Sequence, residues 1–119
     1  SVNSARLFLA ERVAAIFQQA GAKVKNSDGY PGWKPNMDSK ILDICFEQYV
    51  KTFGYEPEVK AIHAGLECGL FLTAYPGLDM ISVGPTLRGV HSPSERLELR
   101  TVNMVFIHLL EILRNIPQA

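Results

Sequence analysis

The sequence predicts an α/β fold in which helices and strands form layers. After residue 38 the expected elements run helix, strand, helix, strand, loop, helix, which is the order of a layered α/β arrangement. Residues 78–83 (LDMISV) are apolar enough for a strand at the centre of a sheet. The 119 residues fit one small domain or parts of two.

A helix is expected near the start of the chain. Asn3 or Ser4 can cap it, and Gly21 follows its last turn in the position where glycine usually ends a helix. Residues 22–26 are expected to form a short strand. One apolar stripe recurs at helical spacing, formed by Leu9, Val13, Ile16, Phe17 and Ala20.

Residues 27–38 (SDGYPGWKPNMD) are rich in glycine and proline, which predicts a linker or hinge. We place a domain boundary near residues 33–35, so the predicted domains are 1–34 and 35–119. Tyr30 and Trp33 in this segment either stack on a ligand or pack at the domain junction.

A second helix is predicted between a cap at Asp38 or Ser39 and a stop at Gly54. Residues 58–63 are then expected as a strand, and Gly65 opens a short helix that Pro76 and Gly77 end. The inward-facing side of the second helix is predicted to hold Ile41, Leu42, Cys45, Phe46 and Tyr49.

The last helix is predicted to begin at a Thr101 cap. His108 within it is expected at the helix surface or partly buried. Its buried face is predicted to comprise Val102, Val105, Phe106, Leu109, Leu113 and Ile116.

Charge and composition exclude several classes of function. Twelve basic residues balance twelve acidic ones, and no basic stripe is present, so we expect neither nucleic acid nor a membrane as a partner. No apolar run reaches the roughly 20 residues that span a bilayer. Without a signal peptide pattern, Cys45 and Cys68 are expected to be buried, reduced thiols in a cytoplasmic protein.

The stretch RGVHSPSERLE, residues 88–98, contains the first candidate site residue. Gly89 and Pro93 exclude a regular helix, so His91 lies on an irregular segment. It is a metal ligand, a general base or a hydrogen-bonded structural residue. Glu95 either orients the His91 imidazole as an outer-sphere carboxylate or is a surface charge beside Arg96.

A second candidate segment follows the first predicted strand of the second domain. Gly65 lets a ligand approach the backbone closely, between His63 and Glu67, or it only makes the turn while Glu67 faces the helix dipole. Because ligands bind beyond the carboxyl ends of strands, residues 63–67 and 84–95 are expected at one edge of the sheet.

Spacing alone predicts no complete zinc site. A catalytic zinc takes about three protein ligands. The nearby His63, Glu67, Cys68 and Glu95 match no self-contained zinc motif. If His91 binds a metal, its partners lie mostly elsewhere.

Three segments together resemble a known family. They are GYPGWKPN (29–36), IHAGLECGLF (62–71) and GPTLRGVHSPSE (84–95). In their order and spacing the chain is similar to the C-terminal part of the bacterial aminoacyl-histidine dipeptidases, relatives of carnosinase among the two-metal zinc exopeptidases. The resemblance covers essentially the whole chain.

The resemblance implies a fold and a set of site residues. Residues 1–34 would be the last helix and strand of an α+β lid domain, and residues 35–119 the end of a layered αβα catalytic domain. His91 would be a zinc ligand. Gly65, with Glu67 and His63, would contact the substrate.

The activity implied is hydrolysis of Xaa-His dipeptides, such as β-alanyl-histidine, by water held between two zinc ions or other divalent metals. The other ligands and the general-base glutamate would come from the N-terminal half, which is absent here. We therefore expect the isolated piece to be inactive, to retain no zinc and to carry no catalytic residue of its own. Its partners would be the dipeptide, the N-terminal half and a second copy, as a homodimer or through self-association.

Two other functions stay open. A binding or interaction module on the same fold would have lost the chemistry, and a metallo-aminopeptidase or deacylase would share the scaffold.

Overall fold

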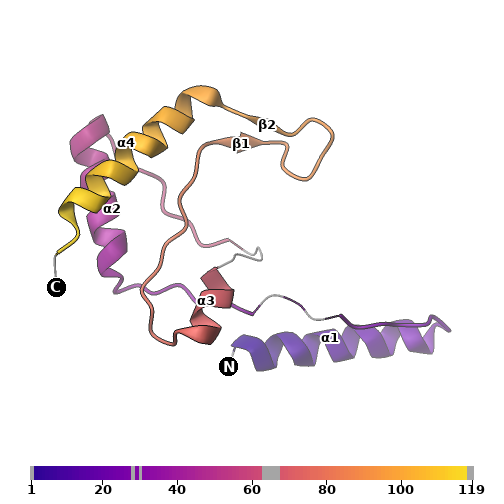
Figure 1. Ribbon diagram of the computed structural model, residues 1–119. Helices are drawn as coiled ribbons and strands as arrows, with labels where there is room; N and C mark the ends of the chain where they lie inside the picture. Colours follow the sequence, from indigo (N-terminus) through magenta and orange to yellow (C-terminus); the bar gives the residue numbers. More distant parts are fainter. Residues whose placement is uncertain (1, 28, 30, 63–67, 118–119) are drawn as a thin grey trace. The chain divides into compact units, whose positions relative to one another are not determined.

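The computed structural model describes residues 2–27, 29, 31–62 and 68–117. Its elements are α1 (Val2–Gln19), α2 (Lys40–Phe53), α3 (Cys68–Ala74), β1 (Leu87–Arg88), β2 (Arg96–Leu97) and α4 (Leu99–Asn115) (Figure 1). The chain divides into two compact units. Unit 1 comprises residues 1–36 and 61–78, and unit 2 comprises 37–60 and 79–119.

Helix α1 of unit 1 is the predicted N-terminal helix. It ends at Gln19, and Gly21 follows with a φ of 84°, which favours glycine, and an N–H that donates to Gln18 O at 2.9 Å. Asn3 lies inside the helix, and its side chain accepts from the Gly32 N–H at 2.7 Å. The predicted cap at Asn3 is therefore wrong, and the residue instead ties the hinge to α1.

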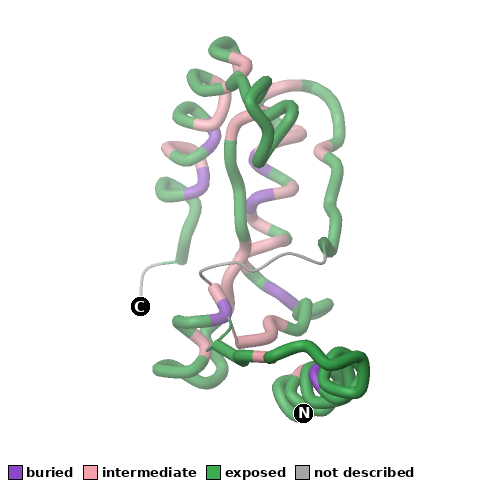
Figure 2. The backbone as a smooth tube through the Cα atoms, turned by 90° about the vertical axis from the view of Figure 1, so that its right-hand side faces the viewer, coloured by how far each residue is buried: buried purple, intermediate pink, exposed green. Residues whose placement is uncertain are grey.

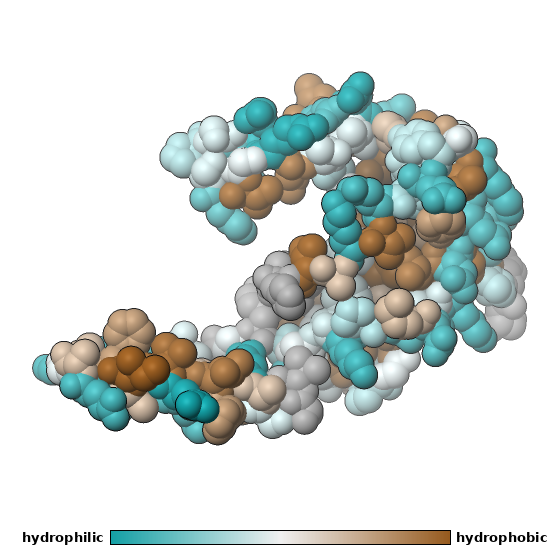
Figure 3. All heavy atoms as spheres, turned by 180° about the vertical axis from the view of Figure 1, so that it is seen from behind, coloured by the Kyte–Doolittle hydropathy of each residue, from teal (hydrophilic) through white to brown (hydrophobic). Residues whose placement is uncertain are grey.

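Most of the apolar stripe of α1 faces solvent within unit 1. Ile16 is 65% exposed and Leu9 is 61% exposed, whereas Ala14 is buried. Hydrophobic side chains gather along this helix in the space-filling view (Figure 3).

The predicted strands of this chain do not form. Residues 22–26, 58–62 and 78–83 are extended or irregular and have no strand assignment. A strand is stabilised by hydrogen bonds to a neighbouring strand. In the described part of the chain, no strand pairs with any of these three segments. Residue 63 of the second predicted strand lies outside the described residues.

Helix α3 confirms a short helix before Pro76 and Gly77. A Cβ added to Gly69 would lie 2.5 Å from the carbonyl oxygen of Pro31, so this glycine permits close contact between α3 and the hinge. Gly65, predicted to open the helix, is outside the described residues.

Helix α2 of unit 2 is bounded as its sequence predicts. Of the two candidate caps, Ser39 caps it: its Oγ accepts from the Leu42 N–H at 3.1 Å. Gly54 ends it at φ 78°, and its N–H donates to Val50. The predicted inward-facing residues are all buried or half-buried, Cys45 being 4% exposed.

Helix α4 differs from its prediction in both its start and its buried face. Its N-cap is Glu98, and Thr101 lies in the first turn. It packs against α2 through buried His108 and Ile112, and the buried positions of both helices lie on the sides that face each other (Figure 2). Only Val105 of the predicted face is half-buried. The other five residues are exposed: Val102, Phe106, Leu109, Leu113 and Ile116.

The side of α4 that meets α2 holds buried His108 and Ile112, with Met104 and Val105 half-buried. Helical periodicity identifies the apolar positions of a helix, but it does not say which side meets a neighbour. None of the helices in the described ranges has the length and apolar character needed to cross a membrane.

Adjacent residues of α4 provide a matched test of this packing. Ile112 is 5% exposed and Leu113 is 58% exposed. We expect Ile112→Ala to lower the free energy of unfolding by about 2–5 kcal/mol, because the buried apolar atoms are lost and a cavity remains. Leu113→Ala should lower it by about 0.5 kcal/mol or less, because that side chain is exposed. Urea unfolding followed by far-ultraviolet circular dichroism measures both. Equal losses would contradict the α2–α4 contact.

Candidate functional site

The candidate ligand His91 lies in a tight hairpin loop. Strands β1 and β2 are antiparallel, with Leu87 paired to Leu97 and Arg88 paired to Arg96, and residues 89–95 join them. Sequence reasoning placed an irregular loop here but missed the hairpin, because each strand is only two residues long.

Two residues of this loop have left-handed backbone geometry. Gly89 and His91 both have φ of 61°. A Cβ on Gly89 would lie 3.1 Å from the carbonyl oxygen of Ser94 as well as adopting an unfavourable φ. Both the tight space and the positive φ therefore favour glycine at position 89.

Hydrogen bonds within the loop fix its path. Gly89 O accepts from the Ser92 Oγ at 2.6 Å and from the Ser92 N–H at 3.1 Å. The Glu95 N–H donates to Ser92 O at 3.0 Å. The carboxylate of Glu95 accepts from the backbone N–H of His91 at 2.9 Å. His91 and Glu95, which the sequence analysis paired, therefore lie together, and they are in contact through the His91 backbone.

The residues predicted to contact the substrate lie outside the described residues: His63, Gly65 and Glu67. Within the part of the chain that the structure does describe, no three His, Cys, Asp or Glu side chains gather closely enough to hold a metal ion. A metal at His91 would need further ligands from other residues or from another polypeptide.

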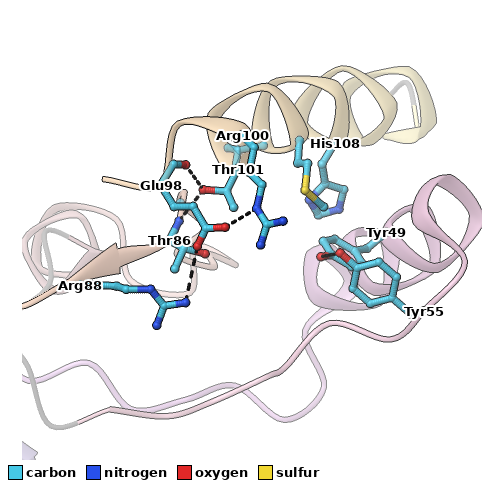
Figure 4. Close-up of a pocket in the computed structure, with 11 residues that line it drawn as sticks. Tyr49, Tyr55, Thr86, Arg88, Glu98, Arg100, Thr101 and His108 are labelled. Carbon is cyan, nitrogen blue, oxygen red and sulfur yellow. Dashed lines mark hydrogen bonds and ion pairs between the residues drawn. The ribbon is translucent and has the colours of Figure 1, made fainter. Parts of the chain in front are cut away.

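A separate cavity of about 440 Å³ lies within unit 2 (Figure 4). It is formed by α2, the segment before β1 and the first turns of α4. The lining residues are Tyr49, Tyr55, Gly84, Thr86, Arg88, Glu98, Arg100, Thr101, Met104, Val105 and His108.

Glu98 links the hairpin to α4 at one side of this cavity. Its carboxylate pairs with Arg100 and, at 3.5 Å, with Arg88. The hydrogen bond from Arg100, more than the charges, holds the pKa of Glu98 below its usual value. A carboxylate before the first turn also faces the positive end of the helix dipole. Sequence analysis missed Glu98, although an acidic residue directly before an apolar periodic run is a signal for a helix start.

Thr101 makes the second link between the same elements. Its Oγ donates to Glu98 O at 2.7 Å and accepts from the Thr86 N–H at 2.9 Å. The start of β1 is thereby fixed to the first turn of α4, so the hairpin that carries His91 is anchored to the packed helices.

The cavity's other wall is aromatic. His108 Nε2 lies 2.8 Å from the carbonyl oxygen of Cys45, and its ring meets the Tyr49 ring edge-on at 5.2 Å. The Tyr49 and Tyr55 hydroxyls are 3.0 Å apart. His108 was expected at the helix surface or partly buried, and the structure buries it, with 8% of the residue exposed.

Burial keeps two groups of α2, Cys45 and Tyr49, in their protonated forms at neutral pH. Burial raises the pKa of the Cys45 thiol to about 11, so the free thiol is protonated at neutral pH and is not a nucleophile. Burial, followed by the Tyr55 hydrogen bond, raises the pKa of Tyr49 to about 12. Because its folded pKa exceeds the ordinary 10, neutral Tyr49 stabilises the fold below pH 10, and that stabilisation is lost as the pH rises to about 12.

Comparisons with known proteins show what the chain is related to. It is 38% identical over 116 residues to the cytosol non-specific dipeptidase of Escherichia coli (strain K12). The chain is homologous to this dipeptidase. A solved structure, the aminoacylhistidine dipeptidase of Vibrio alginolyticus, superposes with a TM-score of 0.73 at 39% identity. No family model matches the chain.

The extent of the match defines which part of a dipeptidase is present. It covers 98% of this chain but 24% of the Escherichia coli protein, and 99% of this chain but 24% of the Vibrio alginolyticus chain. The chain corresponds to the C-terminal part of these dipeptidases, so the resemblance and the α/β fold class are both confirmed.

Proposed function

We propose that this sequence is part of a zinc-dependent dipeptidase that hydrolyses Xaa-His dipeptides. The observation that carries the proposal is the match to two dipeptidases along nearly the whole chain, one of them described as an aminoacylhistidine dipeptidase. The substrate class and the metal are proposals, since the chain spans about a quarter of these relatives' length.

In the proposed site His91 supplies a ring nitrogen to one of two zinc ions. Zinc, when bound, polarises the peptide carbonyl and lowers the pKa of a bound water. The chain's own contribution is to hold the imidazole in place, and the bonded loop around Gly89 and Ser92 supports that role. Gly65, Glu67 and His63 are proposed to contact the dipeptide.

The proposed domain roles keep the hinge as the boundary. Residues 1–34 would belong to a lid and residues 35–119 to the catalytic domain. The division between residues 36 and 37 lies close to that boundary, although the first compact unit also takes in residues 61–78.

We propose that the isolated piece is inactive and retains no zinc, because it offers one candidate ligand while a catalytic zinc needs about three. The cytosolic relative supports a cytoplasmic location.

A chimaera tests the proposed function. The chain replaces the matching C-terminal quarter of the Escherichia coli dipeptidase, whose length it covers to 24%. We expect zinc-dependent hydrolysis of β-alanyl-histidine, and a loss of about 100-fold or more in kcat/KM for His91→Ala because a direct ligand is removed. Glu58→Ala, an exposed carboxylate paired with Lys60, is the control and should keep full activity. A folded chimaera in which His91→Ala keeps its zinc and activity would contradict the assignment.

The exposed stripe of α1 supports a further proposal, self-association of the isolated chain. Contiguous apolar surface of this kind promotes contacts between molecules. We expect light scattering to show a mass that rises with concentration, and Ile16→Glu on the stripe to reduce it. Gln18→Glu on the same helix adds the same charge as a control. A constant monomer mass across a wide concentration range would contradict this proposal.

A further inference from the structure

We propose that Glu95 is a positioning residue that acts on the backbone of His91 and thereby sets the direction of its side chain. This inference rests on the proposed role of His91 as a metal ligand. Its starting point is that His91 is the one non-glycine residue with positive φ in the described part of the chain. Residues other than glycine rarely adopt this geometry, so surrounding contacts must maintain it.

The contact that does so is the 2.9 Å hydrogen bond from the His91 N–H to Glu95 Oε2. A charged acceptor makes a stronger bond to a backbone N–H than a neutral one does. Glu95 is itself held at its backbone, because its N–H donates to Ser92 O, and it immediately precedes β2. Its side chain therefore reaches back across the loop from a fixed position.

The geometry of the backbone determines where the imidazole points. Changing φ of His91 from 61° to a negative value would rotate its Cα–Cβ bond relative to Gly89 and β1. A metal ligand must be held within about 0.5 Å of its productive position, so such a rotation would displace the ring nitrogen. Glu95 differs in this respect from the usual outer-sphere carboxylate, which acts on the second ring nitrogen.

The rest of the loop supplies the competing explanation. Gly89 and Ser92 close the turn through their own hydrogen bonds, and on the competing explanation these bonds alone fix the loop. They leave the His91 N–H without a backbone acceptor among the loop bonds described, whereas Glu95 provides one. The positive φ of His91 therefore needs a hydrogen-bond acceptor at position 95 and does not need its negative charge.

The test compares Glu95→Gln, which keeps an acceptor, with Glu95→Ala, which removes it. Nuclear magnetic resonance of the isotope-labelled chain reports the φ of residue 91, from the HN–Hα coupling and nuclear Overhauser effect, and the exchange rate of its amide. Glu58→Ala is the control, and the ring signals of buried His108 report whether the fold is intact.

We expect Glu95→Ala to speed exchange of the residue 91 amide about tenfold or more and to remove the positive-φ signature, since protection follows from the hydrogen bond. Glu95→Gln should retain both. An unchanged φ and exchange rate in Glu95→Ala would overturn the inference. If Glu95→Ala loses the His108 signals, the double variant His91→Gly with Glu95→Ala should restore them, because glycine adopts positive φ freely. Failure of that rescue would also overturn it.

The same variants in the chimaera separate this inference from the proposed function. Loss of an outer-sphere partner weakens metal affinity about 10–100-fold, and we expect that for Glu95→Ala in a zinc competition titration, with Glu95→Gln close to the parent. If His91→Ala abolishes zinc binding while Glu95→Ala leaves affinity unchanged, the positioning role alone is wrong. If His91→Ala leaves zinc binding unchanged, the proposed function is wrong, and the inference that rests on it is overturned with it.

Discussion

The contact between α2 and α4 is the constraint on which the rest of unit 2 depends. His108 lies buried between these helices, and its Nε2 forms a hydrogen bond with the carbonyl oxygen of Cys45, a contact of about 1 kcal/mol that also fixes how the helices meet. With α4 in place, Thr101 in its first turn bonds Thr86 just before β1, and the N-cap residue Glu98 pairs with Arg88 at the end of β1. The loop that presents His91 is therefore supported by the packing of α4 against α2.

The sequence predicted those parts of the fold whose causes are local. Ser39 and Gly54 bound α2 because a hydroxyl and a left-handed backbone satisfy the helix ends directly. The strand at 78–83 was predicted from apolar character and does not form, because strand pairing depends on residues far along the chain. The predicted buried face of α4 was wrong for a related reason: the side that meets α2 includes His108, and which side is buried depends on a partner far along the chain.

The candidate site, too, was predictable from the sequence only in part. His91 was singled out by its position between Gly89 and Pro93, but its metal role came from the resemblance to dipeptidases and not from any spacing of ligands. Its positive φ was not predictable, since it depends on a side chain four residues away folding back to the backbone. His108 gave no signal at all, because an isolated histidine in a helix has the same pattern whether it is buried or exposed.

We propose that this chain contributes one ligand, His91, to a metal site completed by other residues. The most direct test is elemental analysis of the purified chain after it has been loaded with zinc and dialysed. We expect almost no retained zinc, because a stable site takes about three or four protein ligands. One tightly held zinc per chain that is lost in His91→Ala would contradict it, since the chain would then complete a site by itself or with its own copies.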